Sequence, residues 1–226
     1  MLVPQEVACS CQPASAVDRR IPDWASVWRM DPKQTLHSYL RKERDALLAK
    51  LDGLDERSVR WPMTPTGTNL LGLVKHTASM ELGYFGDVFG RPSGVPLPWL
   101  ADDAEVNADM WATAEESREE IVELFRVAAA HADATIEALD LGAPGYVPWW
   151  RPEGRDVTLH RILVHMCVEM ARHAGHADII RELIDGAAGD NDGNLAELST
   201  EKWQAYRLRL EQAAIEAAAR PSRAAE

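Results

Sequence analysis

The long proline-free segment from Thr158 to Ile184 restricts the possible fold more than any other feature of this chain. Its apolar residues recur every three or four positions, which is the spacing of one buried face on an α-helix. Several other segments show the same spacing, and no stretch alternates Val, Ile or Thr with polar residues at the period of a β-strand. We therefore expect an all-α fold.

Capping residues and breaks at glycine and proline mark the expected helix ends. Asp31 followed by Pro32 indicates the start of the first helix. Thr68 or Asn69 caps the second helix, and Thr113 caps the third. We expect a four-helix bundle with an additional C-terminal helix. The five helices are expected over residues 31–54, 69–89, 114–139, 158–184 and 199–220.

The chain has 226 residues, of which 46% are hydrophobic and 27% charged, as in soluble globular proteins. We expect a flexible leader over residues 1–30, a metal-binding helix bundle over 31–186, and a loop with the C-terminal helix over 187–226. Cys9 and Cys11 lie in the leader with one residue between them and no partner pair elsewhere. We therefore expect no disulfide or metal role for them.

The net charge of −12 argues against nucleic-acid binding, because neutralising phosphates requires clustered Lys and Arg. No apolar run reaches the roughly 18 to 20 residues that span a bilayer. Met1–Arg20 also lacks the basic and apolar regions of a secretory signal. We expect a cytoplasmic protein without nucleic-acid or membrane partners. The Ala-rich stretch Gln212–Ala219 makes a homodimer a candidate assembly.

Glu169, His173 and His176 lie near the end of the fourth expected helix. At about 100° of rotation per residue, Glu169 and His173 are one turn apart on the same face, and His176 is rotated only slightly from them. A carboxylate and imidazoles placed in this way are suitable ligands for a divalent transition metal. The pattern indicates Glu169 and His173 as ligands, with His176 as the main competitor for direct binding.

Metal sites in helix bundles take ligands from facing helices, so another helix must supply a further donor. His76 in the second helix fits this role, because Leu73 and Met80 place it on or beside an apolar face. A single inward histidine is more often a hydrogen-bonded core residue, but burying several ionisable groups together is costly without a metal. We therefore predict that His76, Glu169 and His173 bind a metal and act in catalysis through it.

The other histidines receive different roles. His165 lies one turn before Glu169, and we predict that it or His176 forms a hydrogen bond that fixes a metal ligand. His37, His131 and His160 are expected at the surface, because no other donor stands at ligand spacing from the first two and the third is near the helix start.

Most of the tryptophans are expected in loops between helices, where they could wall an apolar substrate pocket. The alternative is that they cover the ends of the bundle as ordinary hydrophobic residues. Trp150 and Arg155, in the loop before the fourth helix, are predicted contacts for the cosubstrate or substrate.

Three segments together resemble the DinB-like superfamily, within its actinobacterial branch of mycothiol-dependent transferases and maleylpyruvate isomerases. They are Leu71–His76, Pro96–Trp99 and Glu169–Glu182, and the resemblance covers residues 35–186. It implies a divalent metal, with zinc expected and nickel the alternative, and mycothiol as cosubstrate. The family's ligand pattern falls on His76, Glu169 and His173. Many relatives have histidine where this chain has Glu169.

These observations predict a metal-dependent thiol transferase. Three protein ligands with an open fourth position are typical of a catalytic metal site, where a bound thiol loses its proton. The thiolate would then attack a small electrophile such as an alkyl or aryl halide, an epoxide, an activated alkene or a maleyl-type double bond. The alternatives are a metal-assisted hydrolase or lyase, an isomerase in a small-molecule pathway, and a metal-binding bundle without catalysis.

Overall fold

The computed structural model describes residues 31–189 and 196–220. The expected leader of residues 1–30, with Cys9 and Cys11, falls outside the described residues. Within the described ranges, no helix is both long enough and apolar enough to cross a membrane.

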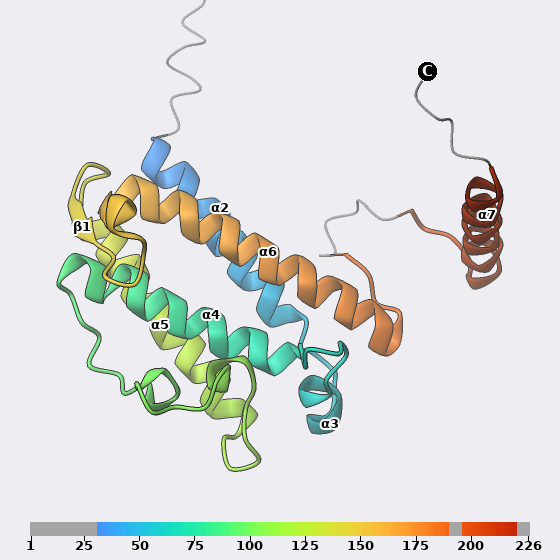
Figure 1. The fold of residues 1–226 in the computed structure, drawn as a ribbon, viewed down its shortest axis with the longest axis horizontal. Coiled ribbons are helices and arrows are strands. Elements are labelled where there is room, and N and C mark those ends of the chain that lie inside the picture. The colour runs from blue at the N-terminus through green and yellow to red at the C-terminus, as the bar shows by residue number, and fades with distance from the viewer. Residues whose placement is uncertain (1–30, 190–195, 221–226) are drawn as a thin grey trace, which may run out of the picture.

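Five long helices form most of the described chain: α2 (Pro32–Ala49), α4 (Leu70–Phe85), α5 (Arg118–Ala138), α6 (Leu159–Asp185) and α7 (Thr200–Ala219). α4 packs against α5 and α6, and α2 packs against α6 (Figure 1). The expectation of an all-α four-helix bundle followed by one further helix is therefore confirmed.

The side chains that cap the first two long helices are those indicated by the sequence. Asp31 accepts a hydrogen bond from the N–H of Lys33 at the start of α2. Asn69 accepts one from the N–H of Gly72 at the start of α4. These bonds satisfy N–H groups that have no partner within the first helical turn.

The start of α5 differs from the expectation that Thr113 is its cap. The cap is Ser117, whose Oγ accepts the N–H of Glu120 while the Glu120 carboxylate accepts the N–H of Ser117. Thr113 and Glu116 are three residues apart, as are Ser117 and Glu120. Glu116, however, forms an ion pair with the buried Lys75, with 2.7 Å between Nζ and Oε1. This long-range ion pair holds the segment against α4, and the helix starts one turn later.

The sequence also gave no indication of several short elements. The expected absence of strands is wrong for the antiparallel pair β1 (Pro144–Tyr146) and β2 (Asp156–Thr158). Three residues per strand are too few to show an alternating pattern. The hairpin packs on η1 (Asp87–Phe89), where a Cβ at Gly145 would lie only 2.7 Å from an aromatic carbon of η1. The short helix α3 (Glu56–Arg60) follows α2 where the sequence predicted only a continued helix and a loop.

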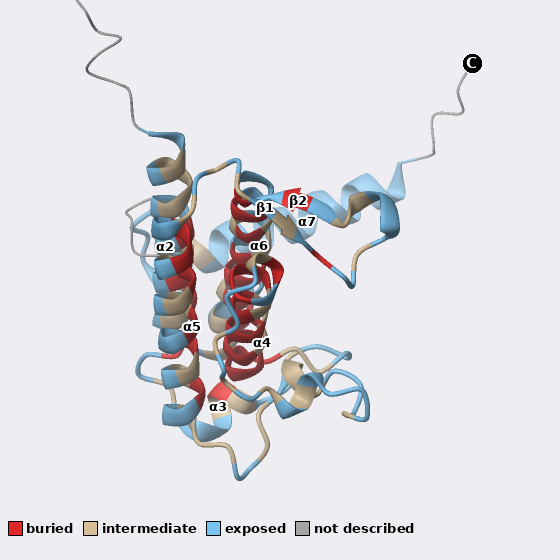
Figure 2. Ribbon diagram, turned by 90° about the vertical axis from the view of Figure 1, so that its left-hand side faces the viewer, coloured by how far each residue is buried: buried red, intermediate tan, exposed pale blue. Residues whose placement is uncertain are grey.

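α4 is the central helix of the bundle, and nearly all of its residues are buried (Figure 2). It supplies core residues to both α5 and α6, whereas α2, α5 and α6 each present an exposed face. α7 buries none of its residues, and its Leu208, Leu210 and Ile215 are exposed. The hydrophobic core therefore belongs to the four bundle helices and their connections.

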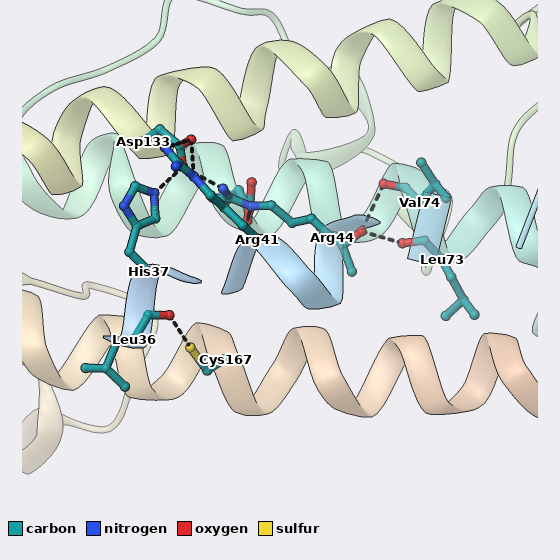
Figure 3. Close-up of polar contacts among 10 residues, drawn as sticks. Leu36, His37, Arg41, Arg44, Leu73, Val74, Asp133 and Cys167 are labelled. Carbon is teal, nitrogen blue, oxygen red and sulfur yellow. Dashed lines mark hydrogen bonds and ion pairs between the residues drawn. The ribbon is translucent and has the colours of Figure 1, made fainter. Parts of the chain in front are cut away.

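A buried ion cluster joins three of the helices. Arg44 of α2 donates from Nε to Glu81 of α4 and from Nη1 to Asp133 of α5, each at 2.6 Å. His37 and Arg41 of α2 also bond Asp133, as Figure 3 shows. The expectation that His37 is a surface residue is wrong, because its side chain is only 12% exposed against this carboxylate.

Replacing Arg44 by leucine is expected to destabilise the fold by about 3–5 kcal/mol, because it leaves the buried Glu81 without its positive partner. Arg41→Leu is the matched control, since that side chain is 51% exposed and its bond to Asp133 is screened by solvent. The control should cost about 1 kcal/mol or less. Urea unfolding of both variants measures the difference. Equal losses would show that the buried pair has no special role.

Burial raises the pKa of Glu81 to about 6 from its ordinary 4.5, and Arg44 offsets this only in part. Between these two values the folded chain holds more protons at this site than the unfolded chain does. The contribution of Glu81 to the free energy of unfolding therefore falls as the pH rises from 4.5 to 6. Above pH 6 this contribution no longer changes with pH.

The stability of the wild type relative to Glu81→Gln should accordingly decrease by about 2 kcal/mol over this pH interval. Urea unfolding at several pH values between 4 and 7 measures the difference. A difference that does not change with pH would contradict the raised pKa.

Candidate functional site

His76 on α4 and His173 on α6 face each other across the contact between the two helices. Their ring centroids are 4.9 Å apart, with the rings nearly perpendicular. One turn earlier on α6, Glu169 places its Oε2 3.9 Å from Nε2 of His173. The fold therefore brings together the three residues that the sequence indicated as metal ligands.

His173 is a neutral imidazole at physiological pH. Burial, together with repulsion from His76, His176 and Arg172, lowers its pKa to about 4. Its Nδ1 is buried and has no hydrogen-bond partner among the described residues. A neutral ring keeps a lone pair for coordination, because no proton competes for it.

Asp109 lies beside His76, and no feature of the sequence predicted this contact. Its Oδ2 lies 2.6 Å from Nδ1 of His76. A carboxylate bound to one ring nitrogen fixes the tautomer and orients the other nitrogen, and metal-binding histidines are commonly held in this way. Nε2 of His76 takes part in no hydrogen bond within residues 31–189 and 196–220, so it is the nitrogen left for a ligand.

Gly72 allows the loop that carries Asp109 to approach α4. The backbone carbonyl of Met110 passes so close that a Cβ at Gly72 would lie 1.8 Å from its oxygen. The amide of Asn69 donates to the same carbonyl at 3.2 Å. Gly72 is one turn before His76 on α4, so this close approach brings Asp109 to the imidazole.

His165 and His176 lie near the site, and within residues 31–189 and 196–220 neither is hydrogen-bonded to a predicted metal ligand. The ring of His165 contacts Tyr84 and Trp150, with centroids 4.8 and 4.9 Å away. Its Nε2 is buried and has no partner in the described part of the chain, and burial lowers its pKa. His176 is exposed, and its ring is 5.7 Å from that of His173.

The β1–β2 hairpin brings Trp149 and Trp150 over Tyr84 of α4. Nε1 of Trp150 donates to the Tyr84 hydroxyl at 2.9 Å, and Nε1 of Trp149 at 3.3 Å. Arg155 donates to the backbone carbonyl of Trp150 at 2.9 Å and to the Tyr146 hydroxyl at 3.4 Å. Trp150 and Arg155, predicted as contacts for the cosubstrate or substrate, form hydrogen bonds that hold the hairpin, while Trp149 lines a cavity.

A cavity of about 500 Å³ opens beside His76. Two larger depressions, of about 650 and 640 Å³, lie along α2 and include none of the predicted ligands. The cavity beside His76 is therefore the better candidate for a substrate site. Its lining comes from α4, the loop after it and the hairpin: His76, Ser79, Met80, Gly83, Tyr84, Asp87, Leu97, Leu100, Asp109 and Trp149.

The predicted ligands have suitable donor atoms but are not closed around a cation. Zinc–nitrogen and zinc–oxygen bonds of about 2.1 Å place neighbouring tetrahedral ligand atoms about 3.4 Å apart, whereas Glu169 and His173 are separated by 3.9 Å. In the described ranges, no group of three or more His, Cys, Asp or Glu is arranged to hold a metal ion. The neutral ring of His173 and the Asp109-oriented His76 are the features that fit a metal.

A sequence model of the mycothiol-S-transferase family matches residues 35–186. The chain belongs to the mycothiol-S-transferase family. The matched region runs from the first turn of α2 to the glycine that caps α6, and it contains His76, Glu169 and His173. No curated protein sequence matches the chain. Membership of the mycothiol-S-transferase family confirms the resemblance seen in the sequence and makes this chain a transferase enzyme.

Gly72→Ala is expected to destabilise the protein by about 1–3 kcal/mol, because the new Cβ must displace the Met110 carbonyl and the loop behind it. Gly175→Ala in α6 is the matched control, since its Cβ would meet nothing within 4 Å. The control should stabilise by up to about 1 kcal/mol through helix propensity. Urea unfolding compares the two variants, and a neutral effect of Gly72→Ala would show that the loop is not fixed at this point.

Proposed function

We propose that this chain joins mycothiol through its sulfur to a small electrophile, with a divalent metal held by His76, Glu169 and His173. The observation that carries the proposal is the convergence of two imidazoles and a carboxylate from α4 and α6 beside a cavity, in a member of the mycothiol-S-transferase family. Zinc is the metal that best suits two nitrogen donors and one carboxylate, with nickel as the alternative.

When bound, the metal would lower the pKa of a coordinated thiol so that it is a thiolate at neutral pH. The residues of the chain prepare this state. Asp109 orients Nε2 of His76, and burial keeps His173 neutral. Glu169 adds one negative charge, so the ligand set leaves a site of net charge +1 for a divalent ion, which favours a thiolate.

The cavity would hold the electrophile next to the sulfur. Met80, Leu97, Leu100 and Trp149 give it apolar walls, and these exclude water that would compete with the thiol. With an alkyl or aryl halide, a carbon–sulfur bond forms and the bond from that carbon to the halogen breaks. The leaving group departs with the electron pair, and the thiol proton is released to solvent.

Metal analysis and a conjugation assay on the same preparations test the proposal. The purified wild type should contain about one divalent ion per chain and should conjugate mycothiol to 1-chloro-2,4-dinitrobenzene, with release of chloride. His173→Ala should lose both the metal and the conjugation activity. Asp109→Asn should weaken metal binding about 10- to 100-fold while leaving all three ligands in place.

His160→Ala is the control, because His160 is exposed at the start of the same helix and should change neither property. Unchanged metal content in His173→Ala would rule out the ligand assignment. A full complement of metal without any thiol conjugation would overturn the transferase reaction and favour hydrolysis or a binding role.

A further inference from the structure

The cavity beside His76 has an uneven charge distribution. Two carboxylates, Asp87 and Asp109, line it, and no lysine or arginine among residues 31–189 and 196–220 does. Asp109 is bonded to His76, whereas the side chain of Asp87 forms no hydrogen bond or ion pair within the described ranges. Asp87 is exposed, at the point where α4 gives way to the loop after it.

Three basic residues of the surrounding elements form contacts that do not involve the two carboxylates. Lys75 is buried, pairs with Glu116 at 2.7 Å and lies 4.1 Å from the ring centre of Trp99. Arg155 bonds the carbonyl of Trp150, and the guanidinium of Arg161 lies 5.0 Å from the ring centre of the same residue. Trp150 does not line the cavity. These cations therefore leave the negative charge of the cavity wall uncompensated.

The remaining walls are apolar or aromatic. Met80, Leu97 and Leu100 supply aliphatic surface, and Trp149 and Tyr84 meet at 69° with their ring centres 5.4 Å apart. Aromatic faces attract cations, and carboxylates repel anions across a partly desolvated space. The lining therefore suits an apolar molecule that is uncharged or positively charged, and it disfavours one that carries a carboxylate.

We propose that the electrophile of this enzyme is an apolar compound without negative charge, and that Asp87 favours substrates with a cationic group. This inference rests on the proposed function, because it assigns the cavity beside His76 to the electrophile. It separates the candidate electrophiles: alkyl and aryl halides and uncharged epoxides or alkenes fit the cavity, and maleyl-type dicarboxylates do not.

Three benzyl chlorides with matched shapes test this selectivity. Each carries its para substituent through a methylene group: trimethylammonium, isopropyl or carboxylate. In each reaction the sulfur of mycothiol replaces chloride, which leaves with the bonding electrons, and the thiol proton goes to buffer. After subtraction of the uncatalysed rate, kcat/KM should be highest for the cation and lower by an order of magnitude or so for the carboxylate.

Asp87→Asn should reduce the preference for the cation over the carboxylate roughly two- to fivefold, and Asp87→Lys should reverse it. Asp140→Asn is the control, since it removes the same charge at an exposed position that does not line the cavity. The control should leave the preference unchanged. A carboxylate preference in the wild type, or an equal effect of Asp140→Asn, would overturn this inference while leaving the transferase proposal intact.

Binding of the corresponding unreactive benzyl alcohols, followed by tryptophan fluorescence, gives a second measurement that needs no turnover. The order of affinity should again be cation, neutral compound and carboxylate. Absence of product from all three chlorides would overturn the transferase proposal, and the alcohol series would still decide the charge preference of the cavity. Equal binding of the three alcohols would contradict it.

Discussion

The buried bond from Arg44 of α2 to Glu81 of α4 sets the rotation of α4 about its own axis. A fully buried carboxylate is tolerated only with a positive partner, so Glu81 must face α2. Asp133 of α5 takes the other arm of the same guanidinium, which ties three helices to one group. His76 lies about 140° around α4 from Glu81, given 100° per residue. With Glu81 facing α2, His76 faces α6, where His173 meets it.

The second constraint is the docking of long connections onto α4. Gly72 leaves room for the Met110 carbonyl, and this contact brings Asp109 to His76. The short hairpin rests on η1 through Gly145 and contributes Trp149 to the same cavity. Two glycines with no space for a side chain thus set both walls. The cavity and the imidazole pair depend on the same helix, so the proposed chemistry and substrate selection would meet at this point.

The imidazole of His173 is kept neutral, whereas the wall of the neighbouring cavity carries negative charge. Burial keeps the ring of His173 neutral, which suits a metal ligand. The cavity beside His76 carries the carboxylates of Asp87 and Asp109 in its wall, with no lysine or arginine from the described part of the chain lining it. The neutral imidazole of His173 favours a metal cation at the contact between α4 and α6. The carboxylates of the cavity wall favour an uncharged or cationic compound in the cavity. In the proposed reaction, an anionic thiol would be directed to the metal and not to the wall, so the two reactants would not compete for one position.

The sequence by itself determined the helical class, the order of the four bundle helices, and the positions of Glu169 and His173 on one helix face, because helix periodicity and local spacing are written in neighbouring residues. The family match bears out the resemblance found in those same residues. The sequence could not place Asp109 beside His76, pair Glu116 with Lys75, or form two three-residue strands. Each of these depends on contacts between residues far apart in the chain, which arise only when the helices pack and the loops close onto α4.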